Sequence, residues 1–261
     1  MTYILGSMLA FAFLRLSLFF LDQNFAMYFD DVALTMVLGG TLAVGIISAP
    51  WQCWGYFVTS LKGVLFGLQR AERRFIEEAL VFVRNPQAYR KDKPKTIADE
   101  IYLDGKELLE LQFTPEDIQT ILGERLHQLV NKRDMVSAFF LNLAKYPPAF
   151  GLVGTVLGLV NLMRAITEGL DPAQTGVKMA LALVATLYGL LFANFIISPF
   201  AEALEKQVDK ERFQGEIAMQ AVLLCAEGVD LLKSQEMLNS FLPKRKRVNI
   251  LDDAISEEMS A

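Results

Sequence analysis

The sequence contains few of the residues that usually carry metal binding or covalent chemistry. Its 261 residues include only two cysteines and one histidine. Two cysteines do not form a disulfide framework, and the chain shows no metal-ligand spacing, Gly-rich phosphate loop or nucleophile elbow. His127 lies in a charged segment, where a solvated or packed histidine is the expected state. These absences predict that the protein is not an enzyme and binds no cofactor or metal.

A strong excess of one charge is also missing. The chain has 25 Lys and Arg residues against 30 Asp and Glu residues, a net charge of −5. This balance gives no support to nucleic-acid binding, which depends on neutralising phosphates with basic side chains. In contrast, 53% of the residues are apolar, and they gather in a few long runs.

Four of these runs have the length that crosses a membrane, about 17–23 residues for a ~30 Å hydrocarbon core. We therefore predict an all-α membrane protein with four transmembrane helices, a helical cytoplasmic domain between spans 2 and 3, and a helical cytoplasmic tail. The predicted parts in chain order are span 1 (1–21), a periplasmic loop (22–31), span 2 (32–50), the cytoplasmic domain (51–146), span 3 (147–165), a periplasmic turn (166–176), span 4 (177–200) and the tail (201–261).

The basic residues predict the orientation of these spans. Of the 25 Lys and Arg residues, 22 lie in residues 52–146 or after residue 200, whereas residues 22–31 hold three Asp and no base. Loops rich in Lys and Arg stay in the cytoplasm. We therefore expect a multi-pass membrane protein with both termini in the cytoplasm.

The charged parts of the chain predict helices. Residues 62–84 and 97–111 read as helices separated by a Pro-containing, charged loop at 85–95. Thr114, Pro115 and the following acids form a helix start, because an N-cap Thr, an early Pro and first-turn acids all favour one. This helix is expected to run toward residue 146, where two prolines interrupt or kink it.

Spans 3 and 4 differ from ordinary leucine-rich anchors. They are rich in Gly, Ala and Thr, and residues 147–163 and 179–199 contain no charged side chain. Small residues let helix backbones approach closely, and Thr supplies polar atoms that lipid does not. The pair therefore looks suited to pack against other helices and to line a polar path, although it lacks a carboxylate to carry a proton.

Three stretches carry a resemblance to a known family. They are VLGGT at residues 37–41, PAFG at 148–151 followed by GT at 154–155 and Gly158, and ATLYG at 185–189 followed by SP at 198–199. The chain resembles the MotA/PomA family of flagellar stator subunits, within the wider group that includes TolQ and ExbB. TolQ and ExbB proteins have three spans, so the extra N-terminal span favours the MotA side.

The resemblance implies an ion-driven motor component and not an enzyme. Such proteins form a ring, understood as a pentamer, around a MotB/PomB-like single-span peptidoglycan-binding subunit that supplies the essential Asp. The ring is driven by inward flow of protons, or alternatively sodium, and exerts torque on a rotor protein of FliG type. The resemblance also implies a location in the bacterial inner (cytoplasmic) membrane, with membrane lipids as the other expected partner. The alternative is a TolQ/ExbB-like or non-flagellar energy-transducing complex.

The resemblance also implies an ion path that faces the partner subunit. The residues that match it are Thr155, Thr186, Pro148, Pro199, Gly154, Gly158 and Tyr188. A plainer interpretation stands beside each kind of residue. Prolines also start or kink helices, threonines also bond to their own helix, and glycines also serve packing alone.

The expected rotor-facing charges match the family pattern least well. The candidates are Arg70, Arg73, Arg74, Glu77 and Glu78, and an ordinary solvated helix face is the alternative. A second basic cluster, Lys-Arg-Lys-Arg at residues 244–247, follows the tail helix. It is interpreted either as a solvated end or as a contact for anionic lipid headgroups or an acidic partner.

Overall fold

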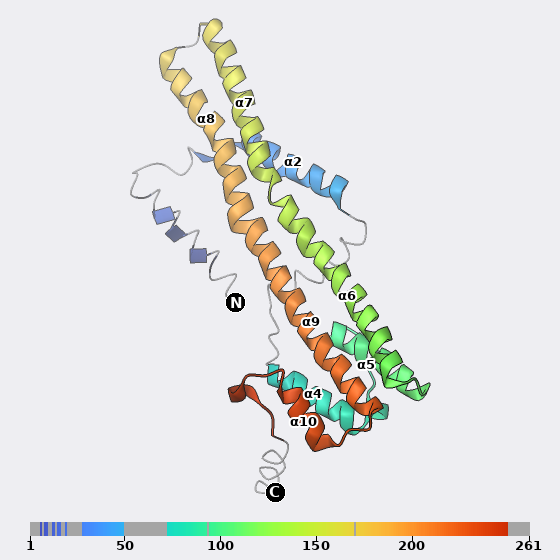
Figure 1. Ribbon diagram of the computed structural model, residues 1–261. Helices are drawn as coiled ribbons and strands as arrows, with labels where there is room; N and C mark the ends of the chain where they lie inside the picture. Colours follow the sequence, from blue (N-terminus) through green and yellow to red (C-terminus); the bar gives the residue numbers. More distant parts are fainter. Residues whose placement is uncertain are drawn as a thin grey trace. The chain divides into compact units, whose positions relative to one another are not determined.

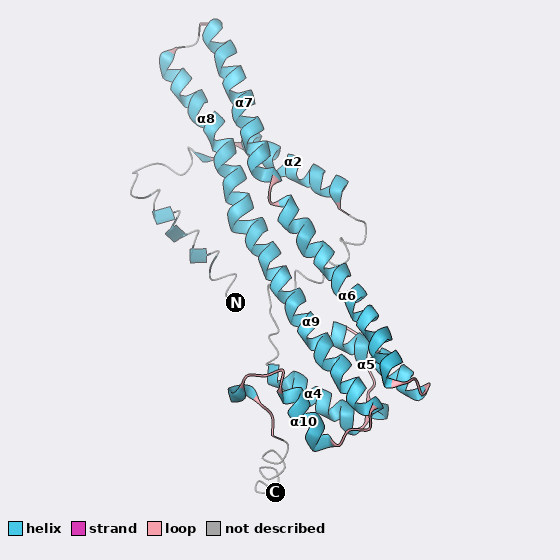
Figure 2. Ribbon diagram, in the orientation of Figure 1, coloured by secondary structure: helices cyan, strands magenta, loops and turns pink. Residues whose placement is uncertain are grey.

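The computed structural model describes scattered residues between positions 6 and 19 and then residues 28–49, 72–92, 94–169 and 171–249. Every regular element in these ranges is helical (Figure 2), which confirms the predicted all-α class for the described part of the chain. The predicted span at residues 1–21 lies almost entirely outside the described residues. The elements in chain order are α2 (Asp31–Ser48), α4 (Glu72–Arg84), η2 (Pro86–Ala88), α5 (Ile97–Glu110), α6 (Pro115–Leu143), α7 (Tyr146–Thr167), α8 (Pro172–Leu191), η3 (Phe192–Ile197), α9 (Ser198–Ala226), α10 (Leu231–Asn239) and η4 (Lys244–Lys246).

Three helical segments among the described residues are long and apolar enough to cross a membrane. They are Asp31–Ser48, Pro115–Thr167 and Gln174–Ala226. The first is α2. The second contains α7, and the third contains most of α8.

The chain divides into two compact units. The first comprises residues 1–67 and 134–206, and the second residues 68–133 and 207–261. Helices α6 and α9 contribute residues to both units. In the first unit, α7 and α8 form an antiparallel pair joined by a short turn, and α2 packs against both (Figure 1).

Helix α2 begins where the Asp30 side chain accepts a hydrogen bond from the backbone N–H of Val32 at 2.9 Å, a normal N-cap. Its buried face recurs every four residues and is made of Ala33, Val37, Thr41 and Gly45. Thr41 is buried, and its hydroxyl donates to the Val37 carbonyl at 2.6 Å, so no polar side-chain atom is left unsatisfied in this face.

The second unit has its own apolar core. It draws fully buried side chains from α4, α5, α6, α9 and α10, and they include Ile76, Ile101, Leu122, Ile217 and Leu238. Among the buried polar groups, Arg133 of α6 forms an ion pair with Glu211 of α9. Removing either partner would strand a buried charge, so the pair fixes the relative position of these two helices in this unit.

The α6 start agrees with its sequence signature. The Thr114 hydroxyl accepts the Asp117 backbone N–H at 3.3 Å and donates to the Asp117 carboxylate at 2.8 Å, so one side chain caps the helix. The helix ends at Leu143, and α7 begins at Tyr146 with buried Pro147 in its first turn. A proline at this position lacks only an N–H that a helix start leaves unpaired.

One feature of the fourth apolar segment is not evident from its hydropathy. Residues Phe192–Ile197 form a π-helix between α8 and α9, and the Ser198 N–H donates to the Ala193 carbonyl five residues earlier. Pro199 follows directly and has no N–H to continue an α-helical ladder. The Asn194 amide donates to the Leu190 carbonyl at 2.9 Å and satisfies a backbone group near the change of helix type.

Candidate functional site

The site is built on a very close approach of α7 and α8. A Cβ on Gly158 would lie 2.5 Å from the Ala182 Cβ, and one on Gly154 would lie 2.7 Å from the Ala185 Cβ. At Gly151 it would lie 2.7 Å from a backbone oxygen of α8. Three glycines on one face of α7 therefore meet small residues of α8, so any larger side chain on this face would separate the helices.

This approach brings two predicted site residues together. The hydroxyls of Thr155 and Thr186, from α7 and α8, are hydrogen-bonded to each other. The Thr155 oxygen also lies 3.1 Å from the carbonyl oxygens of Gly151 and Ala182, and the Thr186 oxygen lies 3.4 Å from that of Gly151. Thr155 therefore makes the ordinary bond within its own helix and, in addition, an interhelical bond.

The two threonines are half-buried, and each hydroxyl keeps oxygen lone pairs. Each hydroxyl has one hydrogen to donate. When one threonine donates to the other, the second can donate to a carbonyl oxygen, which is that of Gly151 or Ala182 for Thr155 and that of Gly151 for Thr186, so both donors are satisfied in either direction. The cluster presents a patch of oxygen acceptors with no charge of its own. Such a patch can accept a hydrogen bond from, or solvate, a cation or a protonated group.

The glycine at the other end of the pair lies against the predicted proline site. A Cβ on Gly189 would lie 2.4 Å from the Pro147 carbonyl oxygen and 2.9 Å from the Pro148 Cα. Pro148 is half-buried in the first turn of α7, and Pro199 is half-buried in the first turn of α9 after the π-helix. Both prolines thus lie at a change of helix.

Tyr188 makes a contact that its sequence motif does not suggest. Its hydroxyl donates to the Tyr28 carbonyl and accepts the Asp30 backbone N–H at 3.2 Å. Asp30 directly precedes α2 and is its N-cap, and Tyr28 lies two residues before it. Tyr188 therefore ties α8 to the start of α2.

The motif glycine in α2 also has a packing partner in α7. A Cβ at Gly40 would lie 2.4 Å from the ring of Phe150. Two motifs that are about 110 residues apart in the sequence are thus in direct contact. Gly40 and Phe150 both belong to the stretches that carry the family resemblance, but only the structure shows that they are in contact.

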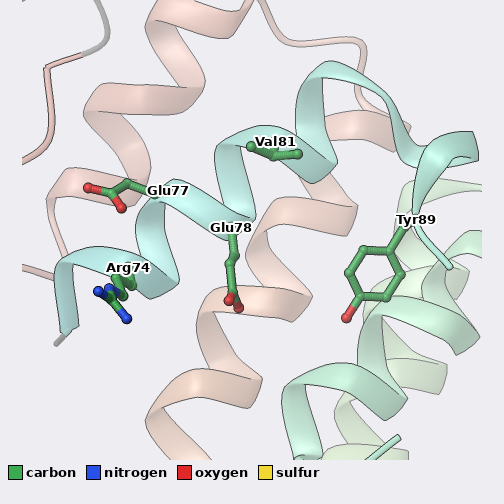
Figure 3. Close-up of a pocket in the computed structure, with 5 residues that line it drawn as sticks. All are labelled: Arg74, Glu77, Glu78, Val81 and Tyr89. Carbon is green, nitrogen blue, oxygen red and sulfur yellow. The ribbon is translucent and has the colours of Figure 1, made fainter. Parts of the chain in front are cut away.

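The expected rotor-facing charges lie on one exposed side of α4. Arg74, Glu77 and Glu78 line an open recess together with Val81 and with Tyr89, which follows η2 (Figure 3). Arg73 forms an i,i+4 ion pair with Glu77 at 2.9 Å, with side chains 49% and 42% exposed. Arg70 lies outside the described residues.

Asp99 supports the Tyr89 side of this recess, and sequence reasoning missed it. Its carboxylate accepts the Tyr89 hydroxyl at 3.3 Å, the Lys95 and Thr96 backbone N–H groups at 3.1 and 3.3 Å, and the Lys91 ammonium. Burial raises the pKa of Asp99, but the hydrogen bonds and the charge of Lys91 outweigh it, and the pKa lies below its ordinary value. The capping pattern Thr96-x-x-Asp99 was the available signal.

The described residues hold no group of three or more His, Cys, Asp or Glu side chains able to bind a metal ion. Fold and site together define an all-helical protein with apolar helices of membrane-spanning length, joined through small residues around an uncharged hydroxyl cluster.

Comparison with known proteins shows which membrane proteins this chain is similar to. Residues 93–216 match the MotA/TolQ/ExbB proton channel family. A Motility protein A of Borreliella burgdorferi is 32% identical over 156 residues, which span 60% of this chain and 59% of that protein. The Chemotaxis protein PomA of Vibrio alginolyticus is 24% identical over 96% of this chain and 98% of its own length.

A solved structure of C. jejuni MotAB has the same fold, with a TM-score of 0.80, 18% identity, and coverage of 95% of this chain and 98% of that chain. The chain is therefore similar to the MotA/TolQ/ExbB proton channel family over residues 93–216, and it shares the fold of the MotAB chain over almost its whole length.

Proposed function

We propose that this protein is the pore-ring subunit of an ion-driven flagellar motor stator. In this role it couples inward ion flow to torque on a rotor, together with a MotB-like partner. The observation that carries the proposal is the Thr155–Thr186 hydroxyl pair, which lies between close-packed apolar stretches of α7 and α8 that carry no charged residue. An ion path of this kind is incomplete in one chain, because transfer of a proton across the bilayer centre needs a titratable relay.

The names of the relatives support the same role. Curated relatives include motility and chemotaxis proteins, and solved structures with this fold include MotAB complexes. By this proposal the protein spans the inner membrane four times with both termini in the cytoplasm. It assembles as a ring, understood as a pentamer, around the partner. The ion is the proton, with sodium as the alternative.

The proposed ion path is lined by Thr155 and Thr186 and is bounded by Pro148 and Pro199. Gly154 and Gly158 keep α7 and α8 close enough for the two hydroxyls to meet, and Tyr188 orients α2 beside them. In the second unit, Arg73, Arg74, Glu77 and Glu78 form the proposed rotor face, with Arg70 as a further candidate.

The test is ion flux in the complex with the one-span partner. Thr155→Val and Thr186→Val, which keep the shape of the side chain and remove the hydroxyl, should each lower flux at least several-fold. Thr155→Ser and Thr186→Ser keep the hydroxyl and should retain most of the flux. Unchanged flux in both valine variants, with assembly intact, would contradict the proposed path.

A TolQ/ExbB-like role in a non-flagellar complex is the second candidate. It is favoured by the α4 segment, which departs from the family pattern around the expected rotor charges. Both candidates predict flux with a partner, but only the flagellar one predicts that the complex restores swimming to a cell that lacks its own stator. Flux without swimming, in a cell with an intact rotor, would favour the second candidate.

A further inference from the structure

The chain after α10 folds back onto the second unit and is held there by one buried side chain. The Asn239 amide donates to the Val248 carbonyl at 2.8 Å, and the Val248 N–H donates to the Asn239 side-chain oxygen at 2.9 Å. Asn239 is 2% exposed and Val248 is 3% exposed. A single side chain thus replaces both backbone partners of Val248 and closes the loop between residues 239 and 248.

The loop is also fixed between its ends. Leu242 is 3% exposed and belongs, like Val248, to the core of this unit. The Lys246 N–H donates to the Pro243 carbonyl at 2.8 Å, which forms the short turn η4. Because the backbone is anchored at Leu242 and Val248, the four basic side chains between them are displayed on a defined backbone.

One of these bases contacts a distant part of the chain. The Lys246 ammonium lies 2.8 Å from the Glu72 carboxylate, 174 residues earlier. Glu72 is the first residue of α4 among the described residues, and Arg73, Arg74, Glu77 and Glu78 follow it on the same helix. An exposed pair of this kind adds little stability. Its main effect is to fix where the loop lies relative to the first turn of α4.

We propose that residues 243–248 form a strap that holds the first turn of α4 in place and thereby positions the charged face of that helix. Asn239 anchors the strap and Lys246 makes its contact with α4. Both are positioning residues, because neither belongs to the charged face itself. The statement that this face works against a rotor rests on the function proposed above, whereas the strap itself does not.

Amide hydrogen exchange in the full-length protein, purified with its one-span partner, tests the strap directly. Asn239→Asp keeps the size of the side chain but removes the donor to the Val248 carbonyl. We expect exchange in residues 240–248 to become faster on the order of tenfold, the effect of losing one buried hydrogen bond. Exchange in residues 72–76 should become faster by up to about fivefold, because the Lys246–Glu72 pair that links them to the strap is exposed. Unchanged exchange at α4 would overturn the proposal.

A charge swap provides a second test that does not depend on the buried anchor. Lys246→Glu places two acids together and should speed exchange in the first turn of α4. The double variant Lys246→Glu with Glu72→Lys reverses the pair and should restore slow exchange. Lys244→Glu makes the same charge change at an exposed position in the same turn and is the matched control. A control effect as large as that of Lys246→Glu would overturn the specific contact.

Swimming speed with the cognate partner then tests positioning. Lys246→Glu should reduce speed at normal membrane assembly, and the swapped pair should recover it. Faster exchange at α4 with unchanged speed would overturn the positioning role. If the unaltered complex fails to drive swimming, the proposed function fails, while the exchange data still decide whether the strap holds α4.

Discussion

At the scale of single residues, the site depends on side chains that are absent and on hydroxyls that are present. Glycine at positions 151, 154, 158 and 189 removes the Cβ atoms that would otherwise meet α8 or α7 at 2.4–2.7 Å. The resulting approach permits the hydroxyls of Thr155 and Thr186 to bond across the two helices. The close approach of α7 and α8 and the hydroxyl bond between them therefore depend on each other, so a change in either alters the other.

Gly189→Ala tests this close approach. The added methyl would meet the backbone of Pro147 and Pro148, which has no flexible side-chain end to move away. We expect a loss of about 1–3 kcal/mol in stability from overpacking, measured as a lower midpoint of thermal unfolding in detergent. Gly176→Ala on the same helix has nothing within 4 Å and should be neutral or slightly stabilising, since Ala favours helix.

Asp99→Asn tests the buried carboxylate beside the recess. The pKa of Asp99 is lowered by its hydrogen bonds and by Lys91 despite burial. Its stabilisation is therefore present above the unfolded pKa and is lost as pH falls through the folded pKa. The variant should lose about 1–3 kcal/mol near neutral pH, and its difference from the unaltered protein should vanish in acid below the folded pKa.

Thermal unfolding of the full-length protein followed by circular dichroism at several pH values measures this effect. Asp104→Asn is the control, because Asp104 forms a more exposed pair with Arg125 at 2.8 Å and should cost less than ~1 kcal/mol. A difference between Asp99→Asn and the unaltered protein that persists unchanged at low pH would contradict the assignment.

At the scale of elements, the fourth apolar segment is not a uniform helix. The π-helix at Phe192–Ile197 separates α8 from α9 and rotates the residues that follow it relative to an unbroken α-helix. After this rotation, the ring of Phe200 meets that of Phe140 edge-on, with centroids 5.0 Å apart. We therefore expect Pro199 to set which face of α9 packs against α6 within the first unit.

The Pro199→Ala variant restores an N–H and removes the steric reason for the break. We expect the segment to return toward α-helix and Phe200 to rotate away from Phe140. Cysteines introduced at positions 140 and 200, after Cys53 and Cys225 are replaced by Ser, should cross-link readily when Pro199 is kept and less readily in the Pro199→Ala background. Equal cross-linking in the two backgrounds would show that Pro199 does not set this register.

At the scale of the whole molecule, one chain leaves much apolar surface uncovered. The exposed apolar side chains of α7 include Leu152, Val153, Val156, Leu157 and Val160. Because few charged residues lie along this helix, its exposed face can contact lipid, neighbouring subunits or a partner helix. The proposed ring contains all three kinds of contact. The missing carboxylate leads to the same conclusion, because the proposed ion path needs a group from another chain.

The protein alone should therefore conduct ions poorly in liposomes, and flux should appear when it is reconstituted with a partner that carries an Asp in its single span. A partner with that Asp changed to Asn is the matched control and should abolish flux, since Asn does not titrate. Robust flux through the protein alone would overturn the proposed division of labour.

The identity of the ion is decided by a separate measurement. Motor speed against external sodium at a fixed proton gradient should stay constant for a proton-driven stator and rise with sodium for the alternative. The hydroxyl oxygens of Thr155 and Thr186 can accept a hydrogen bond from a protonated group or solvate a cation, so these residues do not identify the ion. The dependence of motor speed on sodium does.

The helical class, the helix start at Thr114 and the small, uncharged residues of α7 and α8 could be read from the sequence, because they follow from local capping and from hydropathy over one helix length. The folded structure set which distant groups meet. It joined Thr155 to Thr186, Tyr188 to Asp30, Asp99 to Tyr89 and Lys246 to Glu72. Such pairings depend on how helices distant in the chain pack, and a single sequence carries no local signal for that.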